Sequence, residues 1–411
     1  MAATRLPYLR FTIAGRSAQS LKTLHEHYGE VVRIAPDELS FINGDAWKII
    51  YGTRPGHGQK PKDLRLYPPI SGAPSIITSN DADHSRFRRL LSHAFSDSSL
   101  RGQEPIIKNY VDLLMKRLHE KSENGKQVLD MVAWYNFTIF DIIGDLAFGE
   151  PFDCLKKSTY HQWVAIVMSH VSYSAYTNVT RRFPGWKLIC KIITPTNVMN
   201  SRKLHLQLTK EKDTEKGFSV AEMISNGSTL IIAGSETTAT LLSGATYLLL
   251  KNPRVLQKLQ EEVRTAFQSD KEITLDTCNK LEYIHAVLTE ALRMYPPVAG
   301  GGTIVSVAQL VAYHSALNFT HPDQFIPERF LDDPRFANDS KTVLQPFSFG
   351  PRNCIGRNLA YVEMRIILAR MIFNFDMELD QPSDEWMDQS SYILWDKGPL
   401  MVRLTPRVKR Q

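Results

Sequence analysis

The sequence is poor in cysteine and has no long apolar run. Its four cysteines show neither paired spacing nor a Cys-x-x-Cys motif, which argues against a disulfide framework and favours a reducing compartment; they are Cys154, Cys190, Cys278 and Cys354. A membrane-spanning helix needs about twenty consecutive apolar residues, and no such stretch is present. We therefore expect no membrane-spanning segment and, in the first fifteen residues, neither a signal sequence nor an anchor.

An excess of charge of one sign is also missing. Lys and Arg number 49 and Asp and Glu number 43, and the difference is scattered along the chain. This balance argues against a nucleic-acid-binding protein, although it suits contact with an acidic protein or an anionic membrane surface. The apolar share of 43% and the charged share of 22% are those of an ordinary globular protein. A length of 411 residues predicts two domains, or one large fold with a smaller β-rich part.

Apolar spacing predicts a mainly helical chain with few strands. Two runs near the N-terminus, 31–34 and 38–42, are separated by a Pro-Asp turn and predict a hairpin, and 52–75 reads as a long loop. Helices are expected at 17–28, 101–121, 131–147, 158–173, 219–251, 281–294 and 356–373. The segment 390–407 predicts a second hairpin that turns at Lys397-Gly398-Pro399.

The stretch from Phe347 to Gly356, Phe-Ser-Phe-Gly-Pro-Arg-Asn-Cys-Ile-Gly, is the most informative in the chain. Gly350 and Pro351 break regular structure, and Gly356 opens a helical segment, so Cys354 is predicted to lie in a loop at a helix N-terminus. Backbone N–H groups and the helix dipole favour a thiolate there, and Arg352 favours it further. A lone cysteine is most often a small buried apolar residue, whereas a thiolate held in this way is a metal ligand or a nucleophile.

The pattern Phe-x-x-Gly-x-Arg-x-Cys-x-Gly resembles the haem-binding loop of the cytochrome P-450 family. The resemblance implies a mainly α-helical P-450-like fold with a small β-sheet, and Cys354 as the axial ligand of the iron of haem b (heme). It further implies that Arg352 binds a haem propionate and that Phe347 packs beside the thiolate. Gly350 and Gly356 would let the backbone approach the porphyrin.

Two other stretches match family motifs in order. His84 and Arg88 lie four residues apart on a predicted helix, where the simplest interpretation is a solvated basic face. The family often holds a propionate from these two positions, and Arg86 and Arg89 would then face the reductase. Glu290 and Arg293, with Arg329 in Pro-Glu-Arg-Phe, match the family's buried charged network that holds the cysteine loop in place.

The long helix from Ser219 carries Ala-Gly-Ser-Glu-Thr-Thr at 233–238. Gly and Thr inside a helix can serve close packing, and this alternative has no functional content. The resemblance implies instead that Gly234 leaves room for dioxygen over the iron and that Glu236 and Thr237 deliver protons. It also implies a pocket lined by 66–70, the helix near Leu230, 298–300 and the turn at Lys397.

The chain departs from the family in two internal places. The connection before Ser219, at 210–218, is short, and the interval from Arg293 to Arg329 is only 36 positions long. Near 300–303 the chain omits a hairpin of the sheet and a residue that often binds a propionate, which would weaken haem retention. A genuine short variant and a mispredicted gene model are both open.

The resemblance therefore implies one cytochrome P-450-like domain over 1–411, with a β-rich part at about 28–52, 298–320 and 390–407 and a helical part at about 80–295 and 321–380. The implied activity is that of a monooxygenase, which inserts one atom of O2 into an apolar small molecule. The resemblance is to fungal monooxygenases of secondary metabolism. Electrons would come from NADPH through a cytochrome P-450 reductase. The implied location is the cytoplasmic face of the endoplasmic reticulum, peripherally attached, or the cytoplasm.

Two alternatives come from other classes. One is a degenerate haem-binding relative without monooxygenase activity. The other is an enzyme that uses Cys354 as a nucleophile without haem, for which no His or Asp partner lies at an interpretable spacing.

Overall fold

The computed structural model describes residues 4–53, 56, 58–63, 72–162, 218–300, 304–380, 385–392 and 394–407. The predicted pocket residues 66–70, the second half of the predicted helix 158–173 and the short segments at 210–217 and 301–303 lie outside the described residues. The helices are α1 Leu6–Ile13, α2 Ser17–Tyr28, α3 Asp45–Tyr51, α4 Asp81–Ser92, α5 Asp97–Ser122, α6 Met131–Phe148, α7 Cys154–Lys157, α11 Val220–Lys251, α12 Pro253–Ala266, α13 Leu275–Cys278, α14 Glu282–Met294, α15 Gln309–Tyr313 and α16 Arg357–Asn374.

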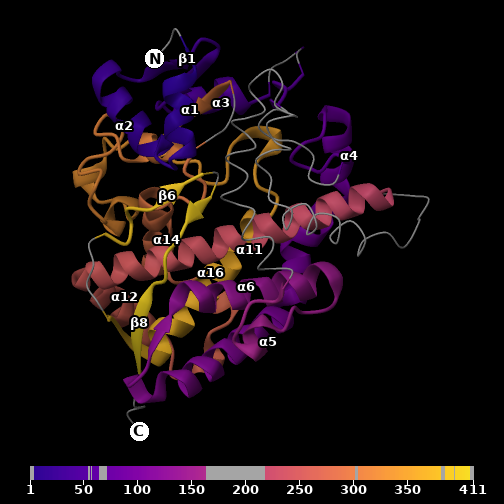
Figure 1. Ribbon diagram of the computed structural model, residues 1–411. Helices are drawn as coiled ribbons and strands as arrows, with labels where there is room; N and C mark the ends of the chain where they lie inside the picture. The colour runs from indigo at the N-terminus through magenta and orange to yellow at the C-terminus, as the bar shows by residue number, and fades with distance from the viewer. Residues whose placement is uncertain are drawn as a thin grey trace.

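The long helix α11 crosses the middle of the molecule (Figure 1). Ser219 accepts a hydrogen bond from the backbone N–H of Glu222, and the Glu222 carboxylate accepts one from the backbone N–H of Ser219, so the predicted capping box is formed. Pro253 at the start of α12 marks the other end. The element that the sequence signals most clearly is thus confirmed over its whole length.

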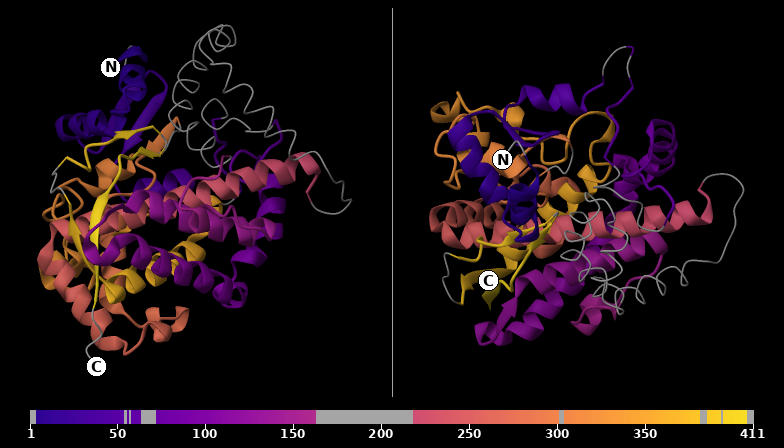
Figure 2. Two further views of the ribbon diagram at one scale, coloured as in Figure 1. Left: turned by 60° about the horizontal axis from the view of Figure 1, so that its bottom comes forward. Right: turned by 45° about the horizontal axis from the view of Figure 1, so that its top comes forward.

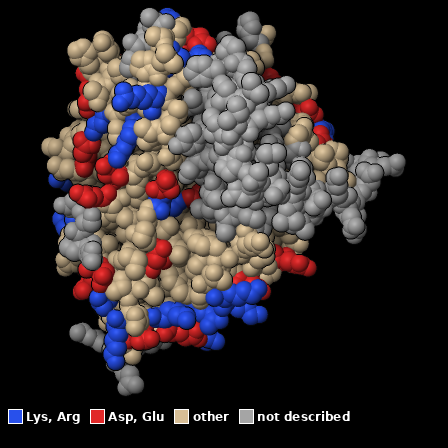
Figure 3. Space-filling view, viewed as in Figure 1, with Lys and Arg blue, Asp and Glu red and all other residues tan. Residues whose placement is uncertain are grey.

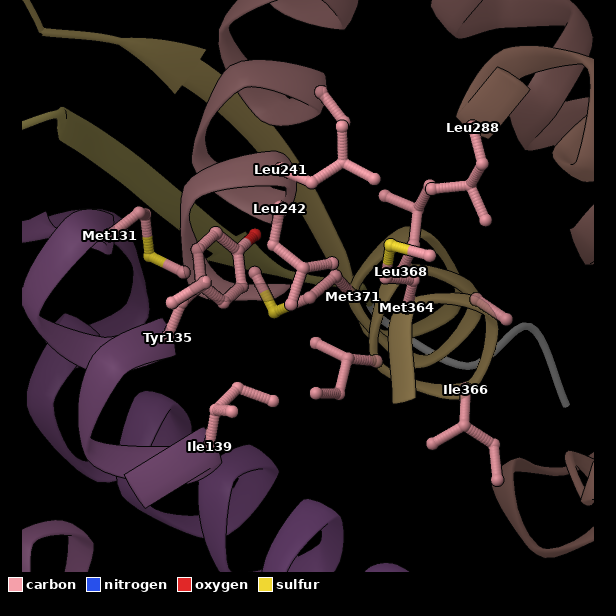
Figure 4. Packing of buried hydrophobic residues seen from close by; sticks show 14 of the residues in the cluster. Met131, Tyr135, Ile139, Leu241, Leu242, Leu288, Met364, Ile366, Leu368 and Met371 are labelled. Atoms are coloured by element: carbon pink, nitrogen blue, oxygen red, sulfur yellow. The ribbon is translucent and has the colours of Figure 1, made fainter. Parts of the chain in front are cut away.

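The main core lies between α6, α11, α14 and α16. Figure 4 shows Tyr135 and Ile139 of α6 facing Leu241 and Leu242 of α11, with side chains of α16 closing the space. The Tyr135 hydroxyl meets Thr246 Oγ1 at 2.7 Å, so the buried phenol keeps a hydrogen-bond partner. Among the described residues, α6 is the helix long and apolar enough to cross a membrane, and 72% of its apolar window is buried in the protein, as in a core helix.

Three small sheets are present in the described part of the chain. Their strands are β1 Val31–Ala35, β2 Glu38–Phe41, β3 Val128–Asp130, β4 Val305–Val307, β5 Phe375–Leu379, β6 Ser390–Ser391, β7 Trp395–Asp396 and β8 Met401–Pro406. β1 and β2 form the predicted hairpin, and β4 joins β2 in parallel with Leu39 opposite Val305. The ranges 28–52 and 298–320 also contain the helices α3 and α15, so the predicted β-rich part is partly helical.

The predicted C-terminal hairpin is wrong in its pairing. β6 pairs with β7 across the residues around Tyr392, whereas β8 pairs with β5 and β3 in a different sheet. The segment between β7 and β8 does not form a tight turn because its polar groups bind elsewhere: Lys397 reaches α11, and the Leu400 N–H donates to Asp130 Oδ1 at 3.0 Å. These long-range contacts override the local turn signal of Gly398 and Pro399.

The N-terminal elements and the helices α5 and α6 lie on different sides of α11. In Figures 1 and 2, α5 and α6 lie on one side, while α1, α2, α3 and β1 gather on the other. On the described part of the face in Figure 3, basic side chains are interspersed with acidic ones, in line with the near balance of 49 and 43 in the sequence. The two sides meet at the Cys354 loop, where the short helical turn Gly350–Arg352 packs against α3.

Candidate active site

The Cys354 loop is held by short backbone hydrogen bonds. The Cys354 N–H donates to the Phe347 carbonyl at 2.8 Å, and α16 begins three residues after the cysteine with Gly356 at its N-cap. Gly350 has φ +76°, and a Cβ there would lie 2.0 Å from the carbonyl oxygen of Tyr51, so only glycine fits. The structure therefore explains Gly350 by its contact with the end of α3. A Cβ on Gly356 would make only an ordinary contact.

Cys354 differs from the other described cysteines in its accessibility. Its side chain is exposed, whereas Cys154 and Cys278 are buried and burial raises the pKa of their thiols to about 11 and about 12. Surrounding protein raises the pKa of Cys354 as well, but the Gly356 N–H, Arg88 and Arg357 act in the opposite direction. The accessible thiol at a helix N-terminus is thus the one placed to bind a ligand.

The residues predicted to bind the haem propionates lie together beside this loop. Arg88 donates from Nη1 to the Asn353 carbonyl at 2.7 Å and from Nη2 to Asn353 Oδ1 at 2.6 Å. Arg352 donates to Gln59 Oε1 at 2.7 Å and to Asp81 Oδ1 at 3.0 Å. His84 lies on the same helix as Arg88 and is only 2% exposed. The three residues line or border an open cavity of about 450 Å³ at Pro351.

Positive charge is in excess in this group of residues, which we call the cationic cluster: His84, Arg88, Arg352 and Lys62. Burial and then Arg352, Arg88 and Lys62 lower the pKa of His84 to about 4. Burial and Arg352 lower the pKa of Lys62 to about 8. His84 Nδ1 and Arg352 Nη1 are buried, and neither has a hydrogen-bond partner among the described residues. Carboxylates of a bound group would supply the missing acceptors and charge, so these residues fit haem propionates.

The central helix presents two different faces. Thr237 Oγ1 donates to the Ala233 carbonyl at 2.5 Å, and Ala233 is exposed, so these two residues share the open face. Gly234 instead faces α6, where an added Cβ would lie 3.1 Å from Ile143 Cδ1. We expected Gly234 to leave room over the iron, whereas its place in the helical turn makes it a packing position against α6.

Glu236 also points away from the open face. It is 2% exposed, its carboxylate forms an ion pair with Lys397, and Thr240 Oγ1 donates to it at 3.4 Å. Burial raises the pKa of Glu236, while Lys397 and Thr240 lower it. The structure therefore separates Glu236 from Thr237, which the sequence placed side by side, and it adds Lys397 as an ionic partner. Sequence reasoning named the Lys397 turn only as part of a pocket wall.

The predicted charged network is assembled in the core. Arg293 donates to both carboxylate oxygens of Glu290, at 2.7 and 2.8 Å, and Arg329 donates to Glu290 Oε1 at 3.1 Å. All three side chains have no exposed surface. Arg329 also donates to Asp339 Oδ2 at 2.5 Å, a partner that the sequence did not reveal because no motif contains it. We call Glu290, Arg293, Arg329 and Asp339 the scaffold cluster.

Comparison with known proteins agrees with this geometry. The family model for cytochrome P450 matches residues 8–190 and 193–404. The chain belongs to the cytochrome P450 family. The predicted recognition and the mainly α fold class are thereby confirmed, and the family implies an iron-containing haem as cofactor.

Several curated P450s are similar over nearly the whole chain. Averantin hydroxylase of Dothistroma septosporum is 46% identical over 452 residues, covering 99% of this chain and 85% of that protein. Cytochrome P450 monooxygenase lcsI of Purpureocillium lilacinum is 44% identical, covering 98% and 87%. Monooxygenase astA of Talaromyces wortmannii is 45% identical, covering 98% and 90%. The chain is thus a haem-thiolate monooxygenase of the fungal type, and nothing in these relatives favours the degenerate alternative.

The same alignments bear on the shortened segments. The alignment with averantin hydroxylase runs over 452 positions although this chain has 411 residues, so the relative carries internal residues that this chain lacks. That agrees with the predicted internal shortening.

Proposed function

We propose that this P450 uses two electrons from NADPH, delivered by a cytochrome P450 reductase, to insert one oxygen atom of O2 into an apolar small molecule of fungal secondary metabolism. The observation that carries the proposal is the accessible Cys354 thiol beside two buried nitrogens, His84 Nδ1 and Arg352 Nη1, that have no hydrogen-bond partner among the described residues. Averantin, named in the relative from Dothistroma septosporum, is the first compound to test.

In this proposal the Cys354 thiolate would bind the haem iron, and His84, Arg88 and Arg352 would hold the propionates. When bound, the haem supplies the activation of dioxygen, which thiolate ligation favours. Phe347 would pack beside the thiolate; its carbonyl accepts a hydrogen bond from the Cys354 N–H, and its ring lies 5.2 Å from that of Tyr361 in α16. The remaining steps depend on groups of the chain itself.

Proton supply is assigned to α11. The Thr237 hydroxyl lies at the open face and can pass a proton from its Oγ1, while the Glu236 carboxylate at the buried face, paired with Lys397, can accept a proton and return it. Gly234 lets α11 pack closely against α6, and this packing fixes the position of Thr237 on α11. Thr237→Ala should retain haem and release more peroxide per NADPH; unchanged peroxide release would remove Thr237 from this role.

The deciding experiment is the reduced-plus-CO difference spectrum of the chain expressed with a haem supply. We expect the red-shifted thiolate-type band, and Cys354→Ser should abolish it. Cys278→Ser is the matched control, because Cys278 is buried under α16 and should leave the band unchanged. A thiolate-type band that survives Cys354→Ser would refute the ligand assignment, and absence of haem from the wild-type chain would favour a non-catalytic protein.

The proposed location is the cytoplasmic face of the endoplasmic reticulum, where the reductase is expected. In support, α1, α2 and α3 gather at one side of the molecule and carry exposed apolar side chains, among them Leu6 at 62%, Tyr28 at 66% and Ile49 at 61%. Flotation of the purified chain with liposomes tests this attachment: it should be weakened by Leu6→Ser with Ile49→Ser, and a chain that never floats would be cytoplasmic.

A further inference from the structure

A buried polar contact joins α11 to a distant part of the chain. Lys397 and Glu236 form an ion pair, and their side chains are only 2% and 3% exposed. Lys397 Nζ also donates to Thr240 Oγ1 at 2.7 Å, and Thr240 Oγ1 in turn donates to Glu236 Oε1 at 3.4 Å. The three side chains therefore form a closed group in which each polar partner is fixed by the other two.

The position of Lys397 is imposed from outside this group. Trp395, two residues earlier in β7, stacks on Tyr295 at the end of α14 with ring centroids 4.8 Å apart. Three residues after Lys397, the Leu400 N–H donates to Asp130 at the start of α6. Because the residues on both sides of Lys397 are anchored to other elements, tertiary contacts place its ammonium group beside Glu236.

Few other ionisable groups face Glu236. Tyr160, after α7, and Tyr295, after α14, lie close enough to sense its charge, and burial raises the pKa of Tyr160 to about 12 and that of Tyr295 well above its ordinary value. Both phenols are thus neutral at physiological pH. Glu236 Oε2 is buried and has no hydrogen-bond partner among the described residues. Lys397 is the cation in the described chain that offsets the burial of this carboxylate.

We propose that Lys397 is a positioning residue for Glu236: from the segment between β7 and β8 it holds the carboxylate in its charged form at the buried face of α11, one residue from Thr237. The proposal rests on the role proposed above for Glu236 in proton supply. Without Lys397, the carboxylate would face a dry surrounding with only the Thr240 hydroxyl as partner.

The test is a pH titration of Glu236 by infrared spectroscopy on the purified holoenzyme. The carboxyl C=O band that disappears in Glu236→Gln belongs to Glu236. In Lys397→Met the pH midpoint of that band should rise by about one to three units, because an opposite charge in contact has been removed. Lys397→Arg should restore most of the wild-type midpoint. An unchanged midpoint in Lys397→Met would overturn the proposal.

Two further variants guard against trivial results. Lys258→Met is the matched control. Lys258 lies on α12 and pairs with Glu328, so its removal should leave the Glu236 band in place. Lys397→Met combined with Glu236→Gln removes both charges and should therefore be more heat-stable than Lys397→Met alone. A double variant less stable than Lys397→Met would show that Lys397 does not act through Glu236.

Peroxide release separates this proposal from the one on which it rests. With reductase and NADPH and without added substrate, Glu236→Gln should change the peroxide formed per NADPH, and Lys397→Met should change it in the same direction. If Glu236→Gln has no effect on peroxide, the role of Glu236 in proton supply fails. The infrared midpoint then still decides whether Lys397 positions the carboxylate.

Discussion

Two buried groups of charges in this molecule are built in opposite ways. In the scaffold cluster each arginine meets a carboxylate, and the guanidinium of Arg293 also donates to the carbonyls of Tyr313 and Pro322. In the cationic cluster His84 Nδ1 and Arg352 Nη1 have no partner in the described chain. The hydrogen bonds of the first group are supplied by the protein, whereas the second keeps two buried nitrogens without an acceptor among the described residues. The difference supports the proposal that the first group serves the fold and the second a cofactor.

The largest effect should come from breaking the scaffold cluster. Arg329→Leu leaves the buried Asp339 carboxylate without a cation and Glu290 with Arg293 alone, so we expect a loss of about 3–5 kcal/mol in the free energy of unfolding. Urea unfolding of the haem-free chain followed by circular dichroism measures it.

The control for this variant is an exposed arginine. Arg335→Leu removes a pair with Asp333 whose arginine side chain is 68% exposed, and it should change the free energy of unfolding far less than Arg329→Leu does. Equal losses for the two variants would mean that the scaffold cluster does not hold the fold.

The cationic cluster should respond in the reverse sense. Arg352→Leu removes a cation whose ionic partner, Asp81, is 46% exposed and can be solvated instead, so the stability of the haem-free chain should change by less than about 1 kcal/mol. Haem retention should fall about 10- to 100-fold, as for loss of a group that supports a bound cofactor. The rate of haem transfer to an excess of apomyoglobin measures retention.

Arg86→Leu is the matched control for Arg352→Leu. Arg86 lies on the same helix as His84 but pairs with Glu222 and Asp83, so its removal should not affect haem transfer. If Arg352→Leu destabilises the haem-free chain as strongly as Arg329→Leu, the comparison between the two clusters is refuted.

The sequence was sufficient to predict contacts between residues that lie a few positions apart in one motif. The capping box at Ser219 and the pairing of Glu290 with Arg293 are set by spacings of three residues, and both are present in the structure. The sequence was not sufficient for Lys397, because its partner Glu236 is 161 positions away and no spacing rule connects them. For Gly234 the motif gives the order of residues but not the direction in which the helical turn presents each one, and the contact with Ile143 of α6 appears only in the structure.

The smallest effect should be a pH dependence at His84. The folded chain lowers the pKa of His84 from the ordinary 6.5 to about 4, by burial and by the charges of Arg352, Arg88 and Lys62. Below pH 6.5 the unfolded chain therefore binds a proton that the folded chain does not, so this group lowers stability as the pH falls from about 6.5 to about 4. His84→Asn should remove that contribution from the stability of the haem-free chain.

Haem should reduce this difference. Propionates beside Arg352 would offset the positive charge that disfavours protonation of His84, although not its burial, so wild-type and His84→Asn holoenzymes should differ less in the pH dependence of the unfolding midpoint than the haem-free chains do. Other buried histidines, such as His25, whose pKa burial also lowers, contribute equally to both chains and drop out of the comparison. If wild type and His84→Asn differ as much with haem bound as without it, the propionate does not lie beside the cationic cluster. A negative charge placed beside His84 would return its pKa toward the ordinary value.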